Sequence, residues 1–300
     1  MPTLLHSCLT ASMEAHEAAP DYPVIDIRHA AARAHVALHG AHLMEWTPSG
    51  HAPVLYLSPQ AMLQKGKAIR GGVPICWPWF GPSEQAAALP AHGFVRNRFW
   101  ELAEASENNE GVQLRLVMGD DEDTRRLWPH AFRLELEMRL GAELHLALKM
   151  TNTGAAPCTL TAALHTYLAV GDIRHVAVEG IDGAEYLDQV GAPCVRRQVG
   201  DVHFDGEVDR EYATSEPVRI VDASLNRVLS VASEGSGCTV VWNPWIDKAA
   251  RLADLPDADY QRFVCVETAN AWKDRVTLEP ASSHILATTV RVENVGQNDR

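Results

Sequence analysis

One histidine and one glutamate stand in apolar, strand-like segments where a charge is unusual. His165 lies within the mostly apolar run Leu160–Leu168, and Glu267 ends the apolar run Phe263–Glu267. Partial burial raises a carboxylate's pKa from about 4.3 toward neutrality, where it works best as a base. A histidine, with an ordinary pKa of roughly 6.5, can donate a proton at the same pH. Together they could move two protons without a cofactor, although each alone also fits a structural role, as a core histidine or an arginine's ion-pair partner.

Positive charge is concentrated in one stretch of an otherwise acidic chain. The whole chain has a net charge of -13, whereas the stretch 65–100 has a balance of +4. Its charged residues are Lys65, Lys67, Arg70, Arg96 and Arg98, opposed by Glu84. Converging guanidinium groups pair bidentately with phosphate or carboxylate oxygens. We interpret this basic segment as an anion site; solvation or local pairing of each arginine is the alternative.

The histidines and cysteines do not predict a metal site. His35, His39 and His42 invite the hypothesis, but the alternating pattern around them is typical of a strand. There, His35 and His39 would lie about 13 Å apart at ~3.3 Å per residue, too far for one ion. Six scattered cysteines form no C-x-x-C pair, so we expect buried reduced thiols and a cytoplasmic location. We predict neither a metal nor a cofactor.

Period-two alternation dominates the chain and predicts β-strands. Apolar and charged residues alternate over Phe132–Leu140, and the pattern resumes over Leu144–Met150 after a glycine-containing connection, as in a β-hairpin with one buried face. Further strand candidates are Val24–Arg28, Val36–Trp46, Val54–Leu57, Gly111–Met118, Cys158–Val170, Val218–Val221, Val228–Val231, Gly237–Trp242, Arg262–Glu267 and His284–Val292. Only Asp121–Trp128 and Ile246–Leu255 favour helix.

The pattern predicts an all-β fold, a large antiparallel β-sandwich with a few short helices. We expect a single domain over residues 1–300, with an ordered core at about 24–292 and flexible ends, because no linker or repeat interrupts the strands. No basic, apolar leader and no run of roughly eighteen apolar residues is present, so neither a signal peptide nor a membrane span is predicted. The acidic balance argues against nucleic-acid binding.

An ordered set of short motifs resembles the hexose-6-phosphate mutarotases (glucose-6-phosphate 1-epimerases). The motifs run from Arg70 to Glu267, about two thirds of the chain. They are Arg70–Pro74, Trp77–Gly81, His92–Phe94 with Arg96–Asn97, Leu164–Tyr167 with Gly171–Ile173, Asp209–Tyr212, Trp242–Trp245 with Lys248–Ala249, and Val264–Glu267. The family belongs to the galactose-mutarotase-like group, and this resemblance implies a large β-sandwich (supersandwich).

The resemblance also implies roles for six residues. It places His165 at the family's acid position and Glu267 at its base position, with His92 as a second active-site histidine that supports the sugar or its ring oxygen. Arg70 and Arg96 resemble phosphate-binding positions. Asp209 resembles a carboxylate that holds sugar hydroxyls.

The chain departs from the family in one position of this region. Ala91 precedes the His-Gly pair, where members often carry Gln, so a direct hydrogen bond to substrate is absent or comes from another residue, with Gln85 as a candidate. Arg98 is outside the pattern and is retained as an extra charge near the phosphate.

The resemblance implies an isomerase that interconverts the α and β anomers of an aldohexose 6-phosphate, with glucose 6-phosphate as the expected substrate. Glu267 would take the proton of the C1 hydroxyl and His165 would protonate the ring oxygen. An aromatic wall could face the sugar, although core packing explains its members equally well: Trp77, Trp79, Phe80, Trp242 and Trp245. A small sugar phosphate is the expected partner, with no nucleic acid and no membrane, and the enzyme is expected to be a monomer.

Three alternatives stay open. A free-sugar (galactose-type) aldose 1-epimerase would use the same acid and base without the basic segment. A non-catalytic carbohydrate-binding protein would need no matched His165 and Glu267, since fold does not determine function. A glycoside hydrolase or lyase could use Asp209 and Glu267 as its two carboxylates.

Overall fold

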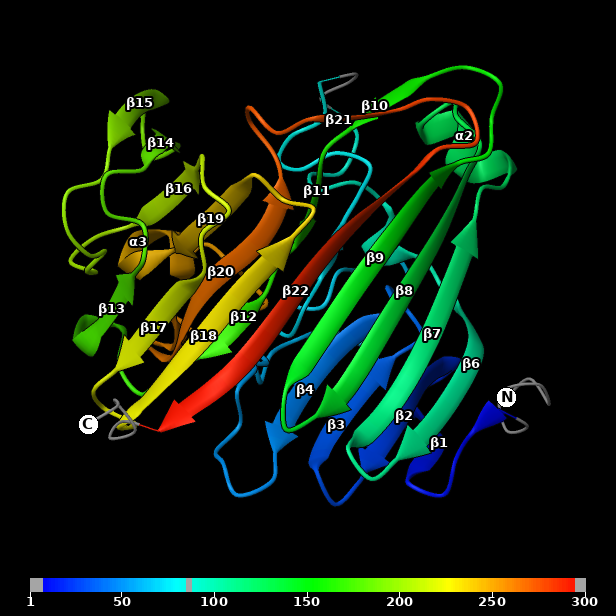
Figure 1. Ribbon diagram of the computed structural model, residues 1–300, viewed down its shortest axis with the longest axis horizontal. Helices are drawn as coiled ribbons and strands as arrows, with labels where there is room; N and C mark the ends of the chain where they lie inside the picture. The colour runs from blue at the N-terminus through cyan, green and yellow to red at the C-terminus, as the bar shows by residue number, and fades with distance from the viewer. Residues whose placement is uncertain (1–7, 85–87, 295–300) are drawn as a thin grey trace.

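The structure, a computed structural model, describes residues 8–84 and 88–294 as antiparallel sheets in two layers (Figure 1). One eight-stranded sheet has the order β13-β17-β18-β22-β9-β8-β7-β6 and forms one layer, with the other sheets behind it in the view. Its strands are β6 (Glu101–Asn108), β7 (Gly111–Gly119), β8 (Phe132–Gly141), β9 (Leu144–Asn152), β13 (Val176–Glu179), β17 (Val218–Asp222), β18 (Arg227–Glu234) and β22 (Ser283–Asn294). The predicted all-β sandwich is confirmed.

The second layer contains a four-stranded and another eight-stranded sheet. The first, in order β1-β2-β3-β4, has strands β1 (Met13–Ala19), β2 (Tyr22–Arg28), β3 (Ala32–Ala37) and β4 (His42–Pro48). The other, in order β15-β14-β16-β19-β20-β11-β5 with β12 also paired to β20, has strands β5 (Ile75–Cys76), β11 (Ala162–Leu164), β12 (Tyr167–Ala169), β14 (Glu185–Asp188), β15 (Cys194–Arg197), β16 (Val208–Tyr212), β19 (Cys238–Asn243) and β20 (Phe263–Asn270). We call this the site sheet.

The remaining elements are short. Strands β10 (Cys158–Leu160) and β21 (Val276–Leu278) pair with each other, and the described helices are α2 (Glu122–Leu127), α3 (Trp245–Ala249) and the 3-10 turns η1 (Val95–Asn97), η2 (Ile173–His175) and η3 (Asp259–Arg262). Within the described residues, no helix is long and apolar enough to cross a membrane.

The hydrophobic core lies between the two layers. The hairpin β8–β9 pairs Leu140 with Leu144, and its alternate residues are buried, as the sequence pattern predicts. Trp46 of β4 is fully buried, and its indole N–H donates to the carbonyl of Gly141 on β8, which ties the small sheet to the opposite layer. Burial of such side chains stabilises the sandwich by about 1.5–3 kcal/mol each.

Local geometry divides two of the expected strands, and a third does not form. Val36–Trp46 forms two strands because Gly40 and Ala41 adopt positive φ angles between them. Cys158–Val170 is divided into β10, β11 and β12, and Val54–Leu57 makes only isolated bridges.

The expected ends of other elements also need correction. The helix expected over Ile246–Leu255 has one short segment, α3, and the chain then continues in turns. The ordered core begins before residue 24, since β1 pairs with β2 from Met13 onward. The outermost residues, on which the expectation of flexible ends also rests, lie outside the described ranges.

In the site sheet, register places side chains in rows across strands β16, β19 and β20. Glu211 pairs with Val240 and Val240 pairs with Glu267, so the three lie in one row. Asp209, Trp242 and Cys265 form the adjacent row. Because residues two apart on a strand share a face, both rows project to the same side of the sheet.

Candidate active site

All six side chains expected at the site line one cavity of about 260 Å³. They are Arg70, His92, Arg96, His165, Asp209 and Glu267. The cavity lies over the rows of the site sheet, and its other walls come from the loop before β5, from η1 and from α3. Residues almost 200 positions apart in the chain therefore meet in one small space.

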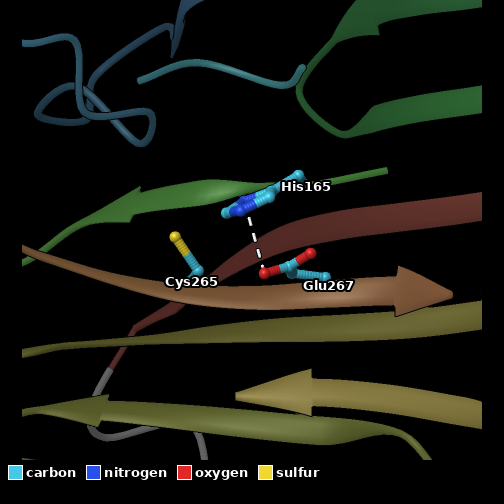
Figure 2. Close-up of side chains that lie close together, drawn as sticks. All are labelled: His165, Cys265 and Glu267. Atoms are coloured by element: carbon cyan, nitrogen blue, oxygen red, sulfur yellow. Dashed lines mark ion pairs between the residues drawn. The ribbon is translucent and has the colours of Figure 1, made fainter. Parts of the chain in front are cut away.

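The acid and base candidates both line this cavity and form a close pair, which the dashed line in Figure 2 marks. His165 Nδ1 lies 3.3 Å from Glu267 Oε1, although the contact does not have hydrogen-bond geometry. His165 is 8% exposed and Glu267 is 1% exposed. His165 Nδ1 and Glu267 Oε2 find no hydrogen-bond partner within the described part of the chain. Buried polar atoms are normally paired, so these two are available to a ligand.

The surroundings shift both pKa values toward the neutral forms. Burial, followed by the carboxylates Asp209 and Glu211, raises the pKa of Glu267 well above 4.5. Burial, followed by the charges of His92, Arg96 and Arg70, lowers the pKa of His165 well below 6.5. Both shifts favour a carboxylic acid beside a neutral imidazole, and the ion pair of carboxylate and imidazolium is the less favoured form with the same number of protons.

Aromatic rings fix the orientation of the His165 imidazole. The ring stacks on Tyr167 at 4.9 Å and 9°, and it meets Trp242 and His92 edge to face at 5.9 and 5.8 Å. The link between β11 and β12 holds its backbone, because the His165 N–H donates to the carbonyl of Pro74. The imidazole cannot tilt away from Glu267 without disturbing these contacts.

The second histidine of the cavity is a neutral hydrogen-bond donor. Burial, followed by the charges of Arg96 and Arg70, lowers the pKa of His92 to about 3. Its Nδ1 accepts from the N–H of Gly81 at 3.3 Å, so the proton of the neutral ring lies on Nε2. His92 has φ +61° and is followed by Gly93 at φ +70°, where a Cβ atom would lie 1.8 Å from the carbonyl oxygen of Trp77. A tight glycine turn thus positions this ring.

The cations of the cavity have different degrees of pairing. Arg70 Nε donates to Asp254 Oδ1 at 3.1 Å, and its Nη1 donates to the Tyr167 hydroxyl at 3.0 Å. Among the residues that the structure describes, Arg96 Nη2 donates to the carbonyl of Ala91 and its buried Nε has no partner. Arg96 is therefore the guanidinium with the most unused donors.

Arg98 does not extend this group. It is absent from the cavity wall and points to helix α2, with Nη1 3.7 Å from Asp121 Oδ2 and 3.9 Å from Asp123 Oδ2. Lys65 pairs with Asp21. The basic segment 65–100 is therefore not one anion site, because its charges separate in space and only Arg70 and Arg96 reach the cavity.

Lys248 is the main site residue to which the sequence assigned no role. It comes from α3, which Asn243 anchors by accepting from the Trp245 N–H, and its Nζ lies 2.7 Å from Glu207 Oε1 and 3.3 Å from Asp209 Oδ2. Its presence in a matched motif was the available signal. Tyr167 and Asp254 also line the cavity, and only Tyr167 falls in a motif.

Most of the expected aromatic wall lies elsewhere. Phe80 and Trp242 line the cavity, whereas Trp77 and Trp79 are packed in the core beside Phe94. Trp245 is not among the cavity residues and packs on Tyr260. Gln85, the candidate to replace a missing hydrogen bond beside Ala91, lies outside the described residues.

The three histidines considered as metal ligands have separate surroundings. His39 Nδ1 contacts the Tyr22 hydroxyl at 3.2 Å, and His42 Nε2 contacts the Gly71 carbonyl at 2.8 Å. His35 lies beside Asp26 and Glu45. The strand argument against a shared ion at these positions agrees with this geometry.

An antiparallel supersandwich with a buried acid–base pair and cations in one small cavity is a protein of the galactose-mutarotase-like class. The chain matches the aldose 1-epimerase family over residues 23–291, and it belongs to that family of isomerases. Its fold is also that of a galactose 1-epimerase from Lactobacillus acidophilus NCFM, with a TM-score of 0.71 at 15% identity over 94% of this chain and 98% of that one.

Nearer relatives narrow the family. The chain is 38% identical to a candidate glucose-6-phosphate 1-epimerase of Escherichia coli strain K12, over 90% of both chains. It is 36% identical to another from Cenchrus ciliaris, over 82% of this chain and 77% of the relative. The crystal structure of a candidate mutarotase from Salmonella typhimurium superposes with a TM-score of 0.90, at 34% identity over 97% of this chain and 98% of that one.

Proposed function

We propose that this isomerase interconverts the α and β anomers of an aldohexose 6-phosphate, with glucose 6-phosphate as substrate. The observation that carries the proposal is that one cavity joins the pair His165–Glu267 to the cations Arg70, Arg96 and Lys248. At about 260 Å³, the cavity is below the ~300 Å³ at which pockets for drug-sized ligands begin, so a single sugar ring suits it. The names of the relatives support the phosphorylated substrate.

The pair performs the proton transfers of ring opening. Glu267 as carboxylate accepts the proton of the C1 hydroxyl, while His165 as imidazolium donates a proton to the ring oxygen. The bond between C1 and O5 breaks, leaving an open-chain aldehyde and the pair with its single proton transferred to Glu267. Rotation about C1–C2 presents the other face, and the reverse transfers close the ring. Each positioned group contributes roughly 10²- to 10⁴-fold.

The other polar groups hold the parts of the sugar that do not react. Arg96 and Arg70 bind the phosphate oxygens, and Lys248 adds a point charge beside Asp209. Asp209, whose pKa burial raises, accepts from sugar hydroxyls. His92 donates from Nε2 to an oxygen of the sugar. We assign His165 as the acid because its Nδ1 lies 3.3 Å from Glu267 Oε1, so the two groups can act on neighbouring atoms of the sugar.

We further propose a monomeric, cytoplasmic enzyme with one domain and no nucleic-acid partner. A continuous core cluster that runs from Met13 to Val290 supports one domain. The six cysteines are free thiols, four of them buried, which suits a reducing compartment. The net charge of -13 disfavours nucleic acid.

The direct test is NMR exchange between anomers of glucose 6-phosphate, with free glucose and free galactose at the same concentration. Acceleration is expected to be far greater with the phosphorylated sugar than with either free hexose. Acceleration with free galactose alone would favour a galactose-type epimerase, and acceleration with none of the three would favour a carbohydrate-binding protein.

The phosphate contact is tested by Arg96→Ala. We expect the KM for glucose 6-phosphate to rise by about tenfold or more, since a charge-assisted hydrogen bond is worth roughly 1.5–3 kcal/mol. The slow turnover of a free hexose should change little. Arg98→Ala is the matched control, because Arg98 lies two residues away and faces α2. Equal changes for both sugars would refute the phosphate role.

A further inference from the structure

Cys265 places a thiol beside the acid–base pair, and the proposed mechanism does not use it. It lies two residues before Glu267 on β20, so both side chains leave the same face of the strand toward His165 (Figure 2). Cys265 is fully buried. One nitrogen, one sulfur and one oxygen from these three residues lie within 4.8 Å of one another, and no other such trio was found in residues 8–84 and 88–294.

We propose that His165, Cys265 and Glu267 form a site for Zn²⁺ or a similar soft divalent cation, and that its occupancy switches the enzyme off. Imidazole, thiolate and carboxylate are the ligands that zinc prefers in proteins. A cation held here would occupy the donor atoms of both the acid and the base. The inhibitory effect rests on the proposed function, whereas the metal site itself does not.

The distances suit tetrahedral coordination with a small adjustment. Two ligand atoms bound to zinc at about 2.1 Å lie about 3.4 Å apart in a tetrahedron, and His165 Nδ1 and Glu267 Oε1 are 3.3 Å apart. The sulfur, bound at about 2.3 Å, would need to approach the nitrogen by at most about 1 Å. Three protein ligands leave a fourth position for water or a sugar hydroxyl.

The polar atoms at this place lack the partners that buried atoms normally have. His165 Nδ1 and Glu267 Oε2 have no hydrogen-bond partner among the residues described, and both residues are more than nine-tenths buried. A bound cation would satisfy them. The thiol proton, and the carboxyl proton where present, leave to solvent as the metal–sulfur and metal–oxygen bonds form.

The charges around these three residues have both signs. Asp209 and Glu211 occupy the two rows that contain Cys265 and Glu267, and their carboxylates attract a dication. Arg70, Arg96 and Lys248 also line the cavity and oppose it, although Arg70 pairs with Asp254 and Lys248 pairs with Asp209.

The experiment combines an activity titration with a direct spectrum. We expect Zn²⁺ to abolish anomer exchange in a saturable way and EDTA to restore it. Co²⁺, the spectroscopic probe, should give the visible bands of tetrahedral coordination and a near-ultraviolet thiolate charge-transfer band. Cys265→Ser should keep its anomer exchange, lose the thiolate band and resist zinc by about tenfold or more.

Cys238→Ser is the matched control, because Cys238 is equally buried on the adjacent strand β19 and should leave zinc inhibition unchanged. Cys265→Ala replaces the serine variant if that variant does not fold, as judged by circular dichroism. A wild-type protein without the thiolate band, or a Cys265 variant as sensitive as wild type, would overturn the metal site. If anomer exchange itself is absent, the proposed function fails while the Co²⁺ spectrum still decides the metal site.

Discussion

The carboxyl group of Glu267 is buried and lines the cavity, with the carboxylates of Asp209 and Glu211 on β16, two strands away. Burial and these charges together disfavour its ionised form. The same environment disfavours the charged form of His165. A carboxylate with a raised pKa accepts a proton more readily. Burial and the nearby carboxylates, which destabilise the ionised form, would therefore assist proton transfer in the proposed mechanism.

Replacing the carboxyl group of Glu267 should lower the activity. We expect Glu267→Gln to lower kcat by roughly 10²- to 10⁴-fold, because the amide cannot accept the C1 proton. NMR anomer exchange measures the loss. A variant that retains most of its turnover would exclude Glu267 as the base.

The stability effect of the same change has a defined sign. Since the folded pKa of Glu267 is raised, its contribution to stability is fully present below about 4.5 and is lost as the pH rises through the folded value. Glutamine does not ionise, so the Tm of Glu267→Gln relative to wild type should rise from pH 5 to pH 9. A difference in Tm that does not depend on pH would contradict this assignment.

Glu211 should tune the base from a distance. It lies two strands from Glu267 in the same row, about 10 Å at ~4.8 Å per strand, and its charge raises the pKa of Glu267. Glu211→Gln should therefore lower that pKa and move the alkaline limb of kcat to lower pH by roughly half a pH unit. The exposed Glu216→Gln is the control, and an unmoved limb in Glu211→Gln would refute the coupling.

At the scale of elements, irregular segments carry much of the chemistry and regular strands hold it in place. His165 lies in the link between β11 and β12, His92 lies in a turn, and Lys248 comes from a five-residue helix. Glu267 alone among the acid and base groups belongs to a central strand. In each irregular segment, local backbone contacts hold one of these side chains in position.

The turn at Gly93 is constrained by a close approach to the backbone of Trp77. Gly93→Ala should place a Cβ atom against the Trp77 carbonyl and displace His92, with a loss of at least about 2 kcal/mol in the free energy of unfolding and a lower kcat/KM. Gly81→Ala is the control, since Gly81 has φ +74° but no atom within 4 Å of a built Cβ. Urea denaturation and anomer exchange measure the two effects, and equal losses would contradict the steric argument.

Strand alternation explains which elements were predictable. The hairpin β8–β9 alternates strictly because one face is buried, so the sequence predicted it almost to its ends. Strands such as β16 and β15 have mixed patterns because cavity residues and edge exposure interrupt the alternation, and they were not predicted. Helix α3 was predicted too long because the chain beyond Ala249 forms successive turns, in which Arg251 N–H donates to Lys248 O and Leu252 N–H donates to Ala249 O.

At the scale of the whole molecule, the sandwich brings together residues that are far apart in the sequence. No local sequence pattern predicts that they lie close together. An apolar strand with one acid identified Glu267, and one histidine in an apolar run identified His165. The approach of Cys265 to both, and of Lys248 to Asp209, depends on sheet order and register, which sequence propensity does not determine. Arg96 and Arg98 are also close in sequence but separate in space. Arg98 follows η1 and points to helix α2, whereas Arg96 lies within η1 and lines the cavity.

Successive side chains of β20 point to opposite faces of the sheet, and this constrains the length of the strand. All eight of its residues are buried and paired in register, so inserting or deleting one residue before Glu267 would turn the base to the opposite face. A substitution in this strand leaves the other side chains on their faces, whereas a change of length by one residue reverses every side chain beyond it. Arg70, Arg96 and Lys248 stand outside this strand, on a loop, on η1 and on α3, so a change of length in β20 reverses Glu267 without being matched by these three.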